Sequence, residues 1–151
     1  MKYSLVAIAI AGCAYKPGSF SSPQSNFSGQ RATVGCLDVA VERRADLSIG
    51  PVLAYQLANR CDHLTMVDLG AVAVVGRNAQ GAEVALRPYD PRAELHPVAL
   101  DGRNVGGEAL AYPADRAISQ ICVDVAKLVH QGAPQWLCLA STAGTVVGSV
   151  P

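Results

Sequence analysis

Short hydrophobic segments with a period of two, separated by turn residues, run through the chain from Thr33 onward. In LDVAVER, Leu37, Val39 and Val41 alternate with polar or small residues, as in a strand that buries one face. PVLAYQLAN repeats this pattern after the turn ADLSIGP, and several similar segments follow. Regularly spaced short strands are typical of a two-sheet sandwich. We therefore expect an all-β fold over residues 33–141, an antiparallel β-sandwich of seven or eight strands.

The later strands are expected in LTMVDLGAVAVV (one long or two short strands), AEVALRPY, ELHPVAL, EALAYP, ISQICVDVAKLV and PQWLCLA. Residues 118–129 fit two structures, because the hydrophobic residues of this segment also share one face of a helix. The alternation of Ile121, Val123 and Val125, together with the high β-propensity of Val and Ile, favours a strand. A helix remains the alternative.

The amino-terminal stretch MKYSLVAIAIAGC begins with one basic side chain, Lys2, and continues as an apolar run that ends at the small residue Gly12. This order is typical of an export signal. A helix rises about 1.5 Å per residue, so the run is far shorter than the hydrocarbon core of about 30 Å and cannot be a permanent span. We expect residues 1–12 to be a signal peptide.

Residues Ile10, Ala11, Gly12 and Cys13 resemble the bacterial lipobox, in which an aliphatic residue and two small ones precede a cysteine. The resemblance implies that the chain is cut after Gly12 and that the thiol of Cys13 receives a diacylglycerol, which would anchor the protein in a membrane. The alternative is a buried first strand in which Cys13 is an ordinary core thiol.

The segment after the lipobox is rich in Ser, Pro, Gly, Gln and Asn and shows no periodicity. We expect residues 13–32 to form the lipidated cysteine and a flexible tether, and residues 142–151 to form a tail. In the enteric sorting pattern an aspartate after the cysteine retains a lipoprotein in the inner membrane. Ala14 stands there in this chain, so the resemblance implies a cell-envelope protein anchored in the outer membrane.

Four further cysteines predict two disulfides in an exported chain. If the segments around Cys122 and Cys138 pair across HQGA, the register that sets these two opposite each other places their aliphatic neighbours together on the other face. Cys36 and Cys61 then remain at one end of the first hairpin, where a bulge or turn at 59–60 would be needed. Free buried thiols are the alternative. The cysteines lack CxxC spacing, which argues against zinc.

The sequence contains no GxSxG, HExxH or P-loop motif. His63, His96 and His130 fall at expected strand ends or loops, where solvated histidines are common. Asp62 and His63 could form a metal corner or an acid–base pair with Asp68, but the sequence supplies no nucleophile or third ligand at a fixed spacing. We expect no enzyme activity, no metal and no cofactor, and we expect Trp136 to pack over the disulfide.

The charges exclude one class of partner. Lys and Arg number 12, Asp and Glu also number 12, and no basic stripe exists. A nucleic acid is therefore not expected to bind.

The stretch YQLANRCDHLTMVDLGAVAVVGRNAQGAEVALRPYD resembles the immunoglobulin-like modules of bacterial envelope proteins, with a strand, an Asn-led turn, a strand and a hairpin. This resemblance covers about a quarter of the chain and implies a fold more than a task.

Two classes of function follow. The first is a membrane-anchored envelope lipoprotein whose sandwich is a non-enzymatic structural module or binds another envelope protein through an edge strand or a loop. The second is a small-ligand-binding lipoprotein or a minor envelope enzyme that uses the loops around His63 and Asp101. A flat apolar patch would favour the first class, and a concave pocket with convergent polar groups the second.

Overall fold

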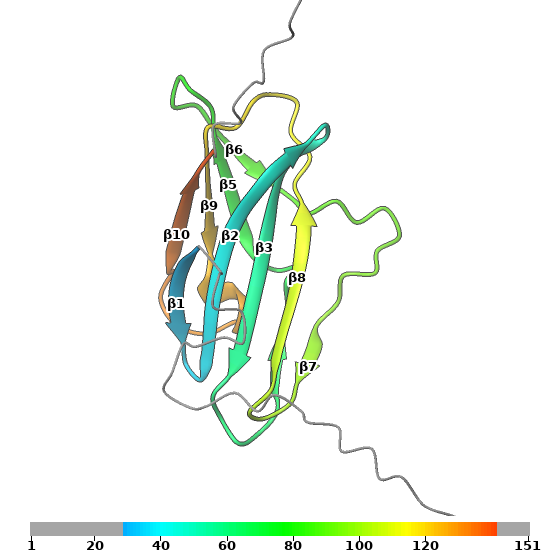
Figure 1. The fold of residues 1–151 in the computed structure, drawn as a ribbon, viewed down its shortest axis with the longest axis vertical. Helices are drawn as coiled ribbons and strands as arrows, with labels where there is room; N and C mark the ends of the chain where they lie inside the picture. Colours follow the sequence, from blue (N-terminus) through cyan, green and yellow to red (C-terminus); the bar gives the residue numbers. More distant parts are fainter. Residues whose placement is uncertain (1–28, 142–151) are drawn as a thin grey trace, which may run out of the picture.

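Two four-stranded antiparallel sheets face each other in the computed structural model, which describes residues 29–141 (Figure 1). The first sheet has the order β1-β2-β3-β8, with β1 (Gln30–Val34), β2 (Leu37–Leu47), β3 (Gly50–Asn59) and β8 (Val105–Ala111). The second has the order β10-β9-β5-β6, with β5 (Ala73–Arg77), β6 (Glu83–Leu86), β9 (Gln120–Asp124) and β10 (Trp136–Ala140). The pair β4 (Thr65–Val67) and β7 (Val98–Leu100) forms a third, small sheet. The expected all-β antiparallel sandwich is confirmed.

The described residues form ten strands, more than the seven or eight expected. One reason is Gly35, whose φ of +58° places it in the left-handed region that glycine adopts easily. There the chain reverses in a two-residue turn that pairs Val34 with Leu37, so the segment expected as one strand becomes β1 and β2. Strand β1 also begins at Gln30, three residues before the expected start of the domain at Thr33.

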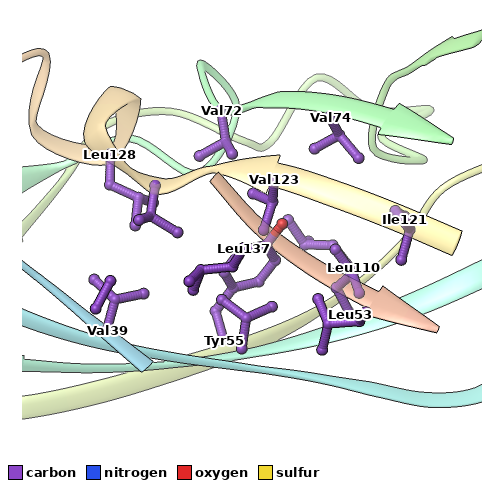
Figure 2. Close-up of a cluster of buried hydrophobic side chains, with 14 of the residues drawn as sticks. Val39, Leu53, Tyr55, Val72, Val74, Leu110, Ile121, Val123, Leu128 and Leu137 are labelled. Carbon is purple, nitrogen blue, oxygen red and sulfur yellow. The ribbon is translucent and has the colours of Figure 1, made fainter. Parts of the chain in front are cut away.

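The core lies between the sheets and is built from alternate residues of their strands. Figure 2 shows side chains of both layers meeting there. The strictly buried positions include Leu37, Val39, Val41, Leu53, Val67, Ile121, Val123, Val125 and Leu128. Burying an aliphatic side chain of this size contributes about 1.5–3 kcal/mol, which makes this layer the main stabilising element of the domain.

Two tyrosines place their hydroxyl groups inside the core. The hydroxyls of Tyr55 and Tyr112 lie 2.6 Å apart, and both side chains are buried. Burial raises the pKa of Tyr55 well above its usual value, and the pKa of Tyr112 to about 12. Both phenols are therefore neutral hydrogen-bonding groups at ordinary pH.

Both expected disulfides are present in the structure. Cys122 and Cys138 are directly opposite each other in β9 and β10, and the same register pairs Val123 with Leu137. Cys36 and Cys61 are joined just beyond the paired ends of β2 and β3.

The turn expected at 59–60 is present. Leu37 pairs with Asn59, and the Arg60 amide donates to the Cys36 carbonyl at 2.8 Å, so the register sets Arg60 and not Cys61 opposite Cys36. Strand β3 ends at Asn59, whose Oδ1 accepts a hydrogen bond from the Cys61 amide at 3.0 Å, and this turn brings Cys61 to Cys36. The register shift of this hairpin lies between Arg44 and Leu47, near its other end.

The ambiguous segment 118–129 contains both structures that its sequence allows. Strand β9 ends at Asp124, and the 3-10 helix η1 (Val125–Val129) follows. The Asp124 carboxylate accepts hydrogen bonds from the Ala126 and Gln135 amides at 3.2 and 2.8 Å, and so caps the helix. The strand interpretation is right for β9 and wrong for the residues after Asp124.

Candidate functional site

A long hairpin of the described chain is interrupted between two paired segments. Strand β5 pairs with β6 in a register that sets Val74 opposite Leu86, and β4 pairs with β7 in a register that sets Val67 opposite Val98. Between these ladders the returning arm, 87–97, is longer than the outgoing arm, 68–73. The arms separate and leave a groove of about 750 Å³. Its walls are formed by Asp68, residues 70–75, residues 85–88, Asp90 and residues 95–97.

The outgoing arm is held by the Asp68 carboxylate. Its Oδ1 accepts hydrogen bonds from the amides of Gly70 and Ala71 at 3.0 and 3.1 Å, which closes a tight turn. Its Oδ2 lies 3.4 Å from Nε2 of His130, the residue that follows η1. The backbone amide of Asp68 also donates to the Leu128 carbonyl at 2.9 Å. This wall of the groove is therefore fixed to η1.

The returning arm is held in a similar way by Asp90. Its two carboxylate oxygens accept from the amides of Glu94 and Leu95 at 2.8 and 3.0 Å. The adjacent Tyr89 amide donates to the Ala111 carbonyl of β8 at 2.7 Å. The arm thus bridges the two sheets on the side of the sandwich away from β1 and β10 (Figure 1). Because both arms are closed by their own hydrogen bonds, the groove is formed before any ligand arrives.

The groove runs beside the free edge of β6. Across the β5–β6 turn, the Asn78 amide donates to the Ala82 carbonyl at 3.1 Å. In an antiparallel ladder, every second residue of a strand directs its backbone N–H and C=O toward the neighbouring strand. Counting from this pair, Val84 and Leu86 form backbone hydrogen bonds with β5. The N–H and C=O of Ala85, which lies between them, therefore point away from β5. Ala85 is exposed and lines the groove. An extended peptide could continue the sheet at this edge.

Two exposed polar side chains, those of Arg87 and His96, stand in the groove wall. None of the ion pairs formed within residues 29–141 involves Arg87. The Nδ1 atom of His96 lies 2.5 Å from the Glu94 carbonyl oxygen of the same arm. Arg87 therefore offers a cation with all its donors available to a bound partner.

The loops around His63 and Asp101 do lie together, as the ligand-binding hypothesis requires, but their polar groups bind one another. Asn59 is fully buried, and its Nδ2 donates to the carbonyls of His63, Leu100 and Asp101 at 2.8, 3.0 and 3.2 Å. These hydrogen bonds join the loops to one another and close one end of the sandwich. The sequence predicts a turn at Asn59 but not that its side-chain amide holds these loops, because an Asn at the end of a strand is the only signal.

Asp62 belongs to the same junction. Arg103 donates to its carboxylate at 2.5 Å, and this hydrogen bond lowers the pKa of Asp62.

The corner of Asp62, His63 and Asp68, which the sequence left as a possibility, is not formed. Asp62 and His63 precede β4 while Asp68 follows it, so the strand separates them, and Asp68 meets His130 instead. Within residues 29–141, no three His, Cys, Asp or Glu side chains gather in a group that could hold a metal ion.

Trp136 and Cys138 share the outer face of β10, where Trp136 is 46% exposed.

The lipobox residues Gly12 and Cys13, and most of the expected tether, lie outside the described residues. Among the residues that the structure describes, no helix is long and apolar enough to cross a bilayer.

Comparison with known proteins adds little. No family model matches the chain, and no curated protein matches it. A solved structure, the yjhA protein from Bacillus subtilis, is similar with a TM-score of 0.44 and 10% sequence identity over 68% of this chain and 83% of that one. A likeness this weak carries no argument about fold or function.

Proposed function

We propose that the protein is a lipid-anchored cell-envelope module that binds an extended segment of another envelope protein along the edge of β6. One observation carries the proposal: the backbone N–H and C=O of Ala85 face outward at an exposed edge, beside a groove already formed. In this mode of recognition the main-chain hydrogen bonds supply affinity and the neighbouring pocket supplies specificity. The groove would receive alternate side chains of the added strand, and Arg87 would favour an acidic one.

The envelope location is supported by two independent features. The two disulfides suit an oxidising compartment outside the cytoplasm. The lipobox-like sequence ending at Cys13 supplies the lipid anchor.

The test of binding at β6 is Ala85→Pro. Proline removes an N–H that points away from β5, so the β5–β6 ladder is retained while a peptide loses its donor. Ala109→Pro in β8 is the matched control. Because the Tyr112 amide donates to the Pro51 carbonyl in the β3–β8 ladder, the same alternation turns the exposed Ala109 amide away from β3.

A photo-crosslinking amino acid at Arg87, introduced into cells that carry the full chain, reports on the groove. We expect a discrete crosslinked partner that is lost with Ala85→Pro and retained with Ala109→Pro. Equal crosslinking in the two proline variants, or none from position 87, would contradict the proposal.

The groove also supports a second candidate, a small-ligand-binding lipoprotein. Its volume of about 750 Å³ lies within the range of about 300–1,000 Å³ that is usual for small-molecule sites. A small ligand would bind through side chains such as Arg87 and would not need the Ala85 amide. A ligand that raises the melting temperature equally in the wild type and in Ala85→Pro would favour this candidate.

A further inference from the structure

The tip of the β2–β3 hairpin exposes two large aliphatic side chains. Leu47 and Ile49, on either side of Ser48, are 58% and 38% exposed. Turns of this kind are usually formed by Gly, Pro, Asn, Asp and Ser, because these residues fit the backbone and prefer water. The last residues of β2, 44–47, are exposed throughout. The two side chains therefore add little to the core, and core packing does not explain why large aliphatic residues stand at this tip.

The tip is held rigidly in place. The Ala114 amide donates to the Ile49 carbonyl at 2.9 Å, which ties the turn to the loop after β8. Gly50 has a φ of +148°, and a Cβ atom there would lie 2.1 Å from the Tyr112 carbonyl oxygen. The tip thus presents its apolar side chains with little further ordering.

The base of the tip is fixed by Arg43, whose side chain is buried. Its guanidinium donates to both carboxylate oxygens of Asp46 at 3.1 and 2.8 Å and to the Ile118 carbonyl at 2.7 Å. This network neutralises Asp46 and joins the hairpin to the strand-connecting loop before β9.

The charges around the tip are unbalanced toward positive. The carboxylate of Asp46 is paired with Arg43. Arg44 and Arg116 are exposed and form no ion pair within residues 29–141, and Asp115 is the exposed acidic residue beside them. One positive charge remains in excess.

The opposite end of the sandwich has no such excess. It also exposes apolar side chains, Leu64 and Met66, at 48% and 51%. Arg103 is paired with Asp62 there, and the exposed Asp101 is offset by the exposed Lys127 of η1, which packs against β4; neither takes part in an ion pair of the described chain. An anionic surface would therefore attract the β2–β3 tip more strongly than the opposite end.

From these observations we infer that the tip, Leu47 and Ile49 with Arg44 beside them, docks on the anionic lipid surface of the membrane that holds the anchor. The inference rests on the lipid anchor of the proposed function. The tether expected from the sequence spans about 25 Å as a coil. Gln30 pairs with Val41, and the strand from Val41 to Leu47 covers about 20 Å, so the tip lies within the reach of the tether.

Because the lipid anchor already holds the protein at the membrane, a weak insertion of the tip into the bilayer is enough to orient the domain. A tethered domain meets the bilayer at a high effective concentration, so two aliphatic side chains can orient it although they could not recruit it from solution. The β2–β3 turn and β7 lie toward opposite ends of the sandwich (Figure 1). Docking by the tip would therefore turn the small β4–β7 sheet, and the groove that adjoins it, away from the lipid and toward a partner.

The test couples the whole chain from Cys13 onward to vesicles through the Cys13 thiol, which lies outside the two disulfides. The vesicles contain phosphatidylethanolamine, phosphatidylglycerol with brominated acyl chains, and a small fraction of maleimide lipid. The reporter is Ile49→Trp in a Trp136→Phe background, and the matched control is Met66→Trp in the same background. Since the coupling is chemical, the result does not depend on whether cells acylate Cys13.

We expect bromine to quench the tryptophan at position 49 at least twofold more than the one at 66, and we expect adding Leu47→Asp to abolish the difference. Equal quenching at the two positions would overturn the inference. Amide hydrogen exchange of the unsubstituted chain is the second measurement, with slower exchange expected on vesicles at 46–50 and not at 62–66. No protection at 46–50 would also overturn it. If cells do not acylate Cys13 but bromine still quenches the tryptophan at position 49, the docking of the tip on lipid is supported and the lipid anchor of the proposed function is refuted.

Discussion

The two hydroxyl groups of the tyrosine pair in the core should contribute to the stability of the domain as a coupled unit. The Tyr55 and Tyr112 hydroxyls are 2.6 Å apart, and both side chains are at most 2% exposed. Tyr55→Phe or Tyr112→Phe leaves the other hydroxyl buried without this partner, which costs about 1–3 kcal/mol. The double variant removes both polar groups together, so its cost should be clearly smaller than the sum of the single costs.

Urea denaturation of the wild type, the two single variants and the double variant at pH 7 gives the coupling free energy directly. We expect a coupling of about 1–3 kcal/mol, because each single variant carries the same penalty of an unpartnered hydroxyl. Additive effects would refute the reasoning, since they would mean that neither hydroxyl depends on the other.

The same pair predicts a loss of stability in alkali. Burial raises the pKa of Tyr112 from 10.0 to about 12, and it raises the pKa of Tyr55 as well. Between pH 10 and 12 the unfolded chain releases protons that the folded chain retains, so the free energy of unfolding falls as the pH rises. For Tyr112 alone the loss is about 2 kcal/mol at pH 12. Tyr55→Phe/Tyr112→Phe should lose less stability over this range, and an identical pH dependence in both proteins would contradict the assignment.

Three further predictions concern stability. Cys122→Ala/Cys138→Ala should lower the free energy of unfolding by about 3 kcal/mol, because the disulfide closes a loop with a sequence separation of 16; an unchanged melting temperature in calorimetry would contradict this. Asn59→Ala should cost about 1–3 kcal/mol in urea denaturation, because three carbonyls lose their donor, and a neutral effect would show that Asn59 does not hold the loops. Gly76→Ala should cost about 1–3 kcal/mol, because a Cβ atom there would lie 2.9 Å from methyl carbons of Ile118 and Leu86, whereas Gly106→Ala, with its nearest neighbour at 3.5 Å, should be tolerated.

The parts of the fold that follow from the alternation of buried and exposed residues along a strand could be predicted from the sequence. The Cys122–Cys138 pairing is one example, because the register that joins the thiols is also the one that buries Leu137 and Leu139. The β1–β2 turn could not be predicted in this way. The buried positions change parity at Gly35, from Ala32 and Val34 before it to Leu37 and Val39 after it. A β-bulge would produce the same change, so only the backbone conformation identifies the reversal.

The candidate site could not be predicted, because it depends on contacts between distant segments. The groove exists because the arm 87–97 is longer than the arm 68–73, a difference that is meaningful only once the β4–β7 and β5–β6 registers are known. Asp68 and Asp90 close these arms by hydrogen bonds to nearby amides. In the sequence they resemble ordinary turn residues.

The most direct test of the central claim, that this is a lipid-anchored envelope protein, is the chemical state of Cys13. Bacteria expressing the full chain or Cys13→Ser are grown with an alkyne-bearing fatty acid, and the amino-terminal peptide of each protein is analysed by mass spectrometry. We predict that the wild type takes up the label and begins at an acylated Cys13, while Cys13→Ser takes up none and keeps residues 1–12. Equal labelling of the two proteins, or a wild-type peptide that runs unmodified through Gly12 and Cys13, would contradict the account.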